Sequence, residues 1–223
     1  MKNGHLTWPW DPDKESPSVL RDELQRVALA LAGNGRRERA TSVVFSSPHP
    51  GHGTSTVALG VARELRCLFG MRPLLIELNR LRPCLEKRFF LDPGRSMFTI
   101  HKQGAGVRDC IQQDSTGLAM LPAGGDWPAT AVSRLTCRTL QEVEGRYDIV
   151  LFDAPPLLES ADVMAAGSAV KELVLIVKSG ATSVDTVTRV KRQTESGGFG
   201  IAGLVVTMQK PVLPRWLDRM LPQ

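Results

Sequence analysis

The sequence lacks the long apolar runs of a membrane protein. No stretch approaches the roughly 18 consecutive apolar residues that a membrane-spanning helix needs, and residues 1–16 contain no apolar segment typical of a secretory signal. We therefore expect neither a membrane span nor a cleaved leader, and we predict a cytoplasmic protein.

Paired cysteines are also lacking. Cys67, Cys84, Cys110 and Cys137 lie far apart and form no C-x-x-C motif. This spacing argues against a zinc knuckle and against a dithiol redox site, and it favours reduced cytosolic thiols.

The bulk composition is that of a globular protein. The 223 residues are 42% hydrophobic and 23% charged, which fits one α/β domain with a large core and excludes wholesale disorder. The net charge of +5 suits anionic partners, such as nucleotide phosphates or an anionic membrane face. The sign of the charge alone selects none of them.

Apolar segments alternate with segments of helical periodicity along most of the chain. The predicted strands are 41–46, 73–78, 118–121, 147–154, 173–178 and 201–208, and the predicted helices are 19–33, 55–69, 129–144, 159–169 and 183–196. Near-continuous apolar strands separated by helices predict a doubly wound α/β fold, in which a mostly parallel sheet carries helices on both faces in a three-layer sandwich. We predict a domain over 19–208, a flexible N-terminal tail over 1–18 and an amphipathic C-terminal tail over 209–223.

A glycine-rich turn follows the first predicted strand with the spacing of a phosphate-binding loop. In the pattern G-x-x-x-x-G-K-[ST], the second glycine is Gly53, the hydroxyl is Ser55, and Thr54 holds the lysine position. Main-chain amides and the start of the next helix bind phosphate in such loops, and they survive loss of the lysine. The predicted nucleotide contacts are Pro50, Gly51, His52, Gly53, Thr54, Ser55, Thr56 and, from the next strand end, Arg82.

Carboxylates follow two other predicted strands. Glu77 ends the second strand, and Asp153 ends the fourth, directly before Ala154-Pro155-Pro156. Carboxyl ends of parallel strands meet at one edge of the sheet, so Asp153 can hold Mg²⁺ or its water opposite the loop. An aspartate before prolines is also a common turn former. The predicted Mg²⁺ ligands are Ser55, Glu77 and Asp153, and the last two are the candidate catalytic carboxylates. A metal pair at His49 and His52 is less favoured, because the motif holds no further ligand.

These motifs resemble those of the bacterial tyrosine kinases, P-loop ATPases that accompany polysaccharide co-polymerases in capsule and exopolysaccharide synthesis. Residues 47–56 are similar to the family motif S-P-x-P-G-E-G-K-S-T, residues 77–83 to D-x-D-x-x-R-P, and residues 153–156 to D-x-P-P. The resemblance spans roughly residues 20–208. It implies a P-loop NTPase fold, ATP or ADP with Mg²⁺ as ligand, a membrane co-polymerase as partner, peripheral location at the inner membrane and no nucleic-acid partner.

The departures from the family pattern concern the chemistry. Thr54 replaces the catalytic lysine, Glu77 and Asn79 replace two aspartates, and Thr207 stands where the family usually has an asparagine near the adenine. The tyrosine cluster that these kinases autophosphorylate is absent from this sequence, whose single tyrosine is Tyr147. We therefore expect no tyrosine autokinase activity of the usual kind.

Loss of the lysine should affect turnover more than binding. One charge-assisted hydrogen bond contributes about 1.5–3 kcal/mol, so nucleotide affinity should fall by roughly 10- to 150-fold. Removing a cation from a transferring phosphoryl group can cost about 10³ to 10⁵ in rate. Arg80 or Arg82 could substitute for the lysine, although a solvated or structural arginine is the simpler interpretation of each.

The two ends of the chain are candidate docking elements. Family members carry E-x-x-R-x-x-R in a helix that reaches the next subunit of a ring; here Glu23 and Arg26 match, and Leu29 occupies the last position. A homo-oligomer is therefore suggested, although a Glu–Arg pair at this spacing is also a common local salt bridge. Trp8 and Trp10 near the N-terminus, and the apolar stripe of 213–221, suit contact with a membrane partner or packing on the domain itself.

The sequence thus predicts a pseudokinase: a degenerate, kinase-like subunit that binds nucleotide and regulates exopolysaccharide or capsule assembly, with weak or no catalysis. One alternative is an active Mg²⁺-dependent ATPase or protein-tyrosine autokinase of the same pathway. Another is a partitioning or positioning ATPase, which is disfavoured because that class needs a lysine where His49 stands.

Overall fold

The computed structural model describes residues 18–33 and 41–209. The strands are β1 (Thr41–Ser46), β2 (Pro73–Glu77), β3 (Gln112–Gln113), β4 (Ala119–Leu121), β5 (Ile149–Asp153), β6 (Glu172–Lys178) and β7 (Gly200–Thr207). The helices are α1 (Ser18–Gly33), α2 (Thr54–Phe69), α3 (Leu85–Phe89), α4 (Met97–Gln103), α5 (Val107–Cys110), α6 (Val132–Val143), α7 (Asp162–Ala166) and α8 (Val184–Ser196), with a 3₁₀ turn η1 (Ala129–Ala131) before α6. Apart from Ser18, which begins α1, and Gln209, the two predicted tails lie outside the described residues, as do Trp8 and Trp10.

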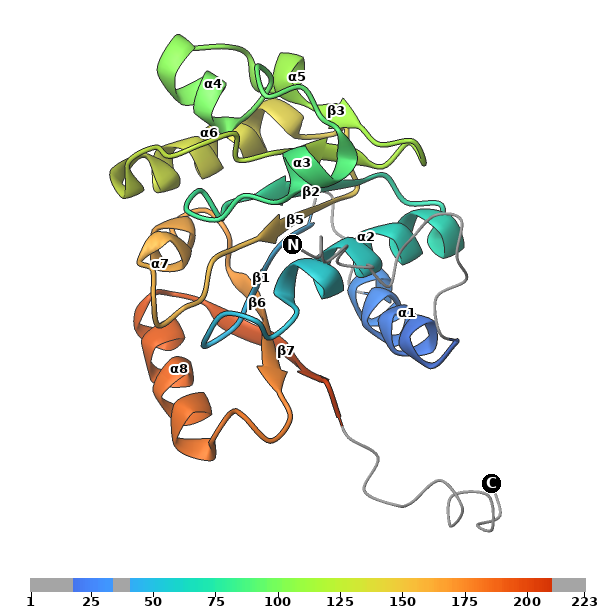
Figure 1. The fold of residues 1–223 in the computed structure, drawn as a ribbon, viewed down its shortest axis with the longest axis vertical. Helices are drawn as coiled ribbons and strands as arrows, with labels where there is room; N and C mark the ends of the chain where they lie inside the picture. Colours follow the sequence, from blue (N-terminus) through green and yellow to red (C-terminus); the bar gives the residue numbers. More distant parts are fainter. Residues whose placement is uncertain (1–17, 34–40, 210–223) are drawn as a thin grey trace, which may run out of the picture.

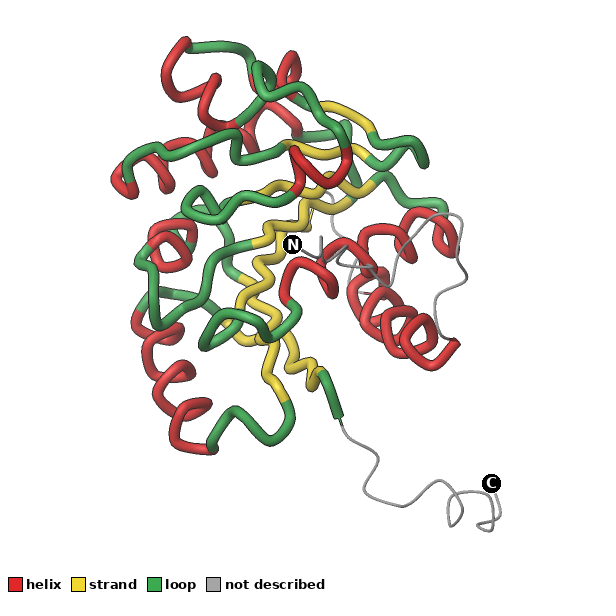
Figure 2. The backbone as a smooth tube through the Cα atoms, in the orientation of Figure 1, coloured by secondary structure: helices red, strands yellow, loops and turns green. Residues whose placement is uncertain are grey.

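The strands form one sheet in the order β3-β4-β2-β5-β1-β6-β7. Every pairing is parallel except that of β3 with β4, which is antiparallel. β1 lies between β5 and β6, and helices flank the sheet on both sides (Figures 1 and 2). The predicted doubly wound, mostly parallel α/β fold is confirmed.

Alternate residues of the central strands pack into two separate cores. Val43 and Phe45 of β1 face a core formed with α1 and α2, while Val44 faces a second core formed with α4, α6, α7 and α8. All five residues of β2 and of β5 are buried, as expected for parallel strands covered on both faces. The apolar runs that predicted these strands are therefore explained by burial on both sides.

Segment 84–113 differs most from the sequence-based prediction. It contains the short helices α3, α4 and α5 and the two-residue strand β3, none of which was predicted. Helices of four to seven residues give less than two turns of apolar periodicity, so their pattern is too short to recognise. The predicted helix over 159–169 is also reduced to the five residues of α7, and Tyr147 precedes β5 rather than opening it.

The first helix packs on the domain through α2. Leu24, Ala28 and Leu31 are buried in the core shared with α2, and Glu64 of α2 accepts a hydrogen bond from Gln25 at 3.1 Å. Glu23 and Arg26, the partial match to the family's ring motif, form an exposed ion pair at 3.4 Å. Ring formation therefore stays a prediction. Among the described helices, none has the length and apolarity to cross a membrane.

Candidate nucleotide-binding site

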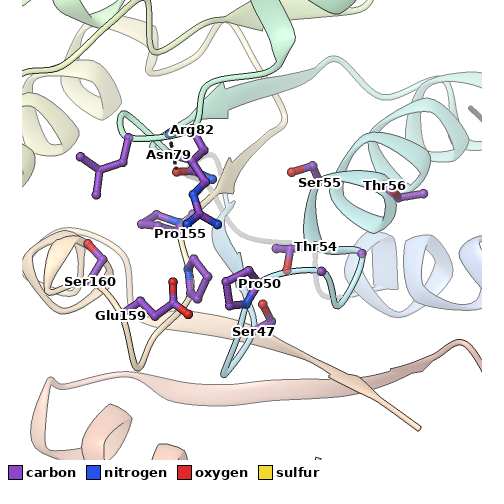
Figure 3. Close-up of a pocket in the computed structure, with 15 residues that line it drawn as sticks. Ser47, Pro50, Thr54, Ser55, Thr56, Asn79, Arg82, Pro155, Glu159 and Ser160 are labelled. Carbon is purple, nitrogen blue, oxygen red and sulfur yellow. Dashed lines mark hydrogen bonds between the residues drawn. The ribbon is translucent and has the colours of Figure 1, made fainter. Parts of the chain in front are cut away.

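Three strand ends meet at the carboxyl edge of the sheet. In the register of the sheet, Asp153 at the end of β5 pairs with Phe45 of β1 on one side and with Glu77 of β2 on the other. The loops that leave these strands enclose a cleft of about 380 Å³ (Figure 3). The cleft is lined by Ser47, Pro50, Gly51, Gly53, Thr54, Ser55, Thr56, Asn79, Leu81, Arg82, Ala154, Pro155, Pro156, Glu159 and Ser160.

The loop between β1 and α2 presents backbone amides to this cleft. Gly51 and Gly53 have φ angles of 75° and 88°, a left-handed conformation that side chains disfavour and that turns the chain sharply into α2. Within the described part of the chain, the amides of residues 53–56 donate no hydrogen bond. Because these amides lie at the positive end of a sixteen-residue helix with no acid in its first turn, they form a site suited to an anion such as a phosphate.

His52 fixes the loop to the sheet instead of facing the cleft. The residue is 4% exposed, and burial lowers the pKa of the imidazole. Its carbonyl accepts a hydrogen bond from the Thr207 hydroxyl at 2.7 Å, and the same hydroxyl is 3.3 Å from the Val177 carbonyl oxygen. Thr207, where the family usually carries asparagine, thus ties the loop to β6 and β7. The ring of His49 lies 6.2 Å from that of His52, and neither belongs to a potential metal-ligand cluster in the described residues.

Asp153 has an unpartnered carboxylate oxygen. The residue is 2% exposed, and its Oδ2 atom has no hydrogen-bond partner. Burial, reinforced by the negative charge of Glu77, raises the pKa of Asp153 to about 7, while the Ser55 hydroxyl and Arg88 act in the opposite direction. A buried carboxylate with an unused oxygen next to the serine of the phosphate loop fits a Mg²⁺ site, because Mg²⁺ takes hard oxygen ligands and usually retains several waters.

Glu77 is used differently from Asp153. It is fully buried, and its Oε1 accepts hydrogen bonds from the amides of Cys84, at 2.5 Å, and Leu85, at 3.2 Å. Its Oε2 accepts one from the amide of Ala123 at 3.1 Å. The carboxylate therefore anchors the start of α3 and the chain after β4, and Mg²⁺ would have to share oxygens that are already hydrogen-bonded.

The thiol of Cys84 completes a buried cluster with these carboxylates. Ligand atoms of Glu77, Cys84 and Asp153 lie within 4.8 Å of one another. Burial and the two neighbouring carboxylates raise the pKa of Cys84 to about 12, so the thiol is protonated at neutral pH. No local pattern indicated this contact, because Cys84 belongs to no cysteine motif.

Two arginines of the loop after β2 have separate environments. Arg80 is 13% exposed and forms ion pairs with Asp162 of α7, at 3.0 Å, and with Asp126, at 2.5 Å. Arg82 is exposed, and its side chain extends into the cleft towards Pro155 (Figure 3). Of the two candidates to replace the missing lysine, only Arg82 lines the cleft.

The predicted site residues thus fall into two groups. Pro50, Gly51, Gly53, Thr54, Ser55, Thr56 and Arg82 line the open cleft, whereas His52, Glu77 and Asp153 are buried next to it. Glu159 and Ser160 also line the cleft and were not predicted, although the intact D-x-P-P motif just before them pointed to this loop. They follow β5 and form the wall that faces the phosphate loop in Figure 3.

Comparisons with known proteins agree with this architecture. No protein-family model matches the chain. The chain is 24% identical over 173 residues to the tyrosine-protein kinase YwqD of Bacillus subtilis, covering 76% of this chain and 73% of YwqD. It is 24% identical over 207 residues to EpsB of Ralstonia solanacearum, named as a tyrosine-protein kinase, covering 91% of this chain and 26% of EpsB.

Solved structures share the fold. The kinase domain of the Escherichia coli tyrosine kinase ETK superposes with a TM-score of 0.77 at 17% identity, covering 96% of this chain and 84% of that domain. Cobyrinic acid a,c-diamide synthase from Mycobacterium smegmatis, with bound ADP and magnesium, has a TM-score of 0.63 at 18% identity, covering 81% of this chain and 80% of that one. In sequence the chain is thus similar to bacterial tyrosine kinases, and it shares its fold with the ETK kinase domain and with the synthase that binds ADP and magnesium.

Proposed function

We propose that this chain is a degenerate kinase-like subunit that binds ADP or ATP and regulates exopolysaccharide or capsule biosynthesis and export, with weak or no catalysis. The proposal depends on one contrast in the cleft, between the free backbone amides and the missing positive charge. The amides of residues 53–56 have no partner in the described chain, while Thr54 provides no positive charge where the family pattern has lysine. Phosphate binding through the backbone is retained, and the group that stabilises charge during phosphoryl transfer is missing.

The amides and hydroxyl of the phosphate loop and the two buried carboxylates beside it have separate roles. The amides of residues 53–56 hold the phosphates, and the hydroxyl of Ser55 together with Asp153 holds Mg²⁺ directly or through water. Glu77 keeps the loop after β2 in place. Bound Mg²⁺ would neutralise part of the phosphate charge and favour the ionised form of Asp153.

The similarity to bacterial tyrosine kinases supports the proposed pathway and partner. The chain spans about a quarter of EpsB, and we propose that a separate membrane polysaccharide co-polymerase is its partner at the cytoplasmic face of the inner membrane. Gene neighbours that encode glycosyltransferases and a co-polymerase would support this assignment. A genomic context with neither would count against it.

An active Mg²⁺-dependent ATPase or autokinase is the second candidate. Asp153 favours this candidate for two reasons. Its unpartnered Oδ2 is available to bind a metal, and a carboxylate with a pKa of about 7 suits proton transfer. The absence of a tyrosine cluster from this sequence favours ATP hydrolysis over autophosphorylation.

Nucleotide binding and hydrolysis measured side by side separate these candidates. We expect ADP to bind with submillimolar affinity, about tenfold more tightly with Mg²⁺ than with EDTA, and ATP hydrolysis to stay at background. Asp153→Ala should remove the Mg²⁺ effect and leave hydrolysis unchanged. Hydrolysis that Asp153→Ala abolishes would reject the pseudoenzyme, and a chain that binds neither nucleotide would reject both candidates.

A further inference from the structure

The cleft contains one basic side chain. Among the fifteen residues that line it, only Arg82 carries a positive charge, and Glu159 carries the only negative one. A nucleoside diphosphate or triphosphate brings two to four negative charges to this space. Backbone amides, a helix terminus and bound Mg²⁺ would offset part of that charge, and a basic side chain can offset more of it.

The other arginine of the same loop is not available for this purpose. Arg80 is held by Asp162 and Asp126, and it is almost buried. Moving its guanidinium into the cleft would leave the carboxylate of Asp162, which is 1% exposed, without its partner. Arg82, in contrast, has no ion pair with any described residue and is solvent-exposed.

The position of Arg82 is fixed by its own loop. Its amide donates a hydrogen bond to the Asn79 side chain at 3.2 Å, which closes a turn, and Pro83 restricts the backbone that follows. The turn is attached to the sheet, because the amide of Leu78 donates to the carbonyl of Asp153 at 2.8 Å. The loop therefore carries Arg82 on a constrained backbone, with its side chain directed into the cleft from the wall across from Thr54 (Figure 3).

We propose that Arg82 supplies the positive charge that the phosphate loop lost at position 54, so that the terminal phosphates of a nucleoside polyphosphate lie between its guanidinium and the amides of residues 53–56. This role rests on the nucleotide-binding function proposed above, and it identifies Arg82 as the side chain that binds the phosphates. A planar guanidinium can donate two parallel hydrogen bonds to a phosphate, so an arginine reaching from a neighbouring loop can replace a lysine ammonium in binding. Arg82 is a binding residue in this role and takes no part in proton transfer.

The test moves the charge from one loop to the other. Binding of ADP with Mg²⁺ is measured by calorimetry for the wild type, Arg82→Ala, Thr54→Lys and the double variant. Arg82→Ala should weaken binding by about 10- to 100-fold, and adding Thr54→Lys should restore most of that loss. Thr54→Lys should improve the wild type by a smaller factor than it improves Arg82→Ala, because the two cations serve the same phosphates.

Two controls separate this effect from general changes in charge or folding. Arg66→Ala removes an exposed arginine from the far end of α2 and should leave ADP binding unchanged. Glu159→Gln removes the negative charge of the cleft and should strengthen binding severalfold. Arg82→Ala should unfold at the same temperature as the wild type, since its side chain is exposed.

The same measurements separate the role of Arg82 from ADP binding itself. If the wild type binds ADP and Arg82→Ala binds it equally well, the role of Arg82 is overturned while nucleotide binding stands. The same conclusion follows if Thr54→Lys improves both backgrounds by the same factor. If the wild type binds no ADP under any condition, both proposals are overturned.

Discussion

The loop after β1 and the loop after β2 lie at the same edge of the sheet, and they keep their shape by different means. The first is shaped mainly by backbone conformation, with glycines at positive φ and a carbonyl held by Thr207. The second is shaped by side chains: Glu77 accepts three amide hydrogen bonds, Asn79 closes a turn, and Arg80 is clamped by two carboxylates. A binding surface built from main-chain groups can tolerate side-chain replacement. In the second loop, Glu77 and Asn79 differ from the family pattern, and both hold the backbone in place through hydrogen bonds.

Glu77 anchors the second loop, and its replacement should have the largest effect. Glu77→Gln leaves one acceptor oxygen and places an amide NH₂ among buried N–H groups that need an acceptor. We expect the free energy of unfolding to fall by about 3–5 kcal/mol, because buried donors lose a charged partner. Urea denaturation measures this change.

Glu159→Gln provides the matched control at the same sheet edge. Its carboxylate is exposed and forms no ion pair with a described residue, so the same substitution should change stability by less than about 0.5 kcal/mol. Equal losses at residues 77 and 159 would contradict the anchoring role of Glu77.

The buried carboxylates Asp153 and Glu77 make the stability of the fold depend on pH. The pKa of Asp153 rises from the usual 3.8 to about 7 in the folded state, so the folded protein retains a proton that the unfolded chain releases. Its contribution to stability is therefore largest below about pH 4 and decreases as the pH rises to about 7, by a total on the order of 4 kcal/mol. The pKa of Glu77 is raised as well, because the effect of burial exceeds that of its amide hydrogen bonds.

Asp153→Asn isolates the contribution of Asp153. Denaturation at pH 5 and pH 8 should show a smaller loss of stability with rising pH in the variant than in the wild type. The difference between the two pH values is the measured quantity, because the amide itself changes stability equally at both. Parallel profiles for the two proteins would show that Asp153 titrates normally.

The sequence predicted this sheet edge well because its signals are local. The strand boundaries agree to within two residues, since each central strand is an apolar run between polar turns. The glycine turn before α2 and the aspartate after β5 are likewise visible as short motifs. Chain order and the geometry of parallel sheets then bring them together without further information.

The parts that could not be predicted depend on partners distant in the chain. Glu77 binds the amide of Ala123, 46 residues away, and Arg80 binds Asp162, 82 residues away. No local sequence pattern distinguishes Arg80, which forms ion pairs with two carboxylates, from Arg82, which lines the cleft two residues later. The contacts that each side chain makes in the folded protein decide its role, and they also make Glu77 an anchor.

The smallest predicted effect concerns the side-chain contact that ties the first loop to the sheet. Thr207→Val keeps the shape of the side chain and removes the hydroxyl that donates to the carbonyl of His52. We expect a loss of about 1 kcal/mol in unfolding free energy and a severalfold loss in ADP affinity, because His52 precedes the amides that face the cleft. Thr188→Val, at an exposed position of α8 where the hydroxyl bonds the Val184 carbonyl, should leave ADP affinity unchanged. If Thr207→Val lowers stability and leaves affinity intact, the backbone conformation set by the glycines is sufficient to hold the loop, and the first loop depends even less on side-chain contacts than the second.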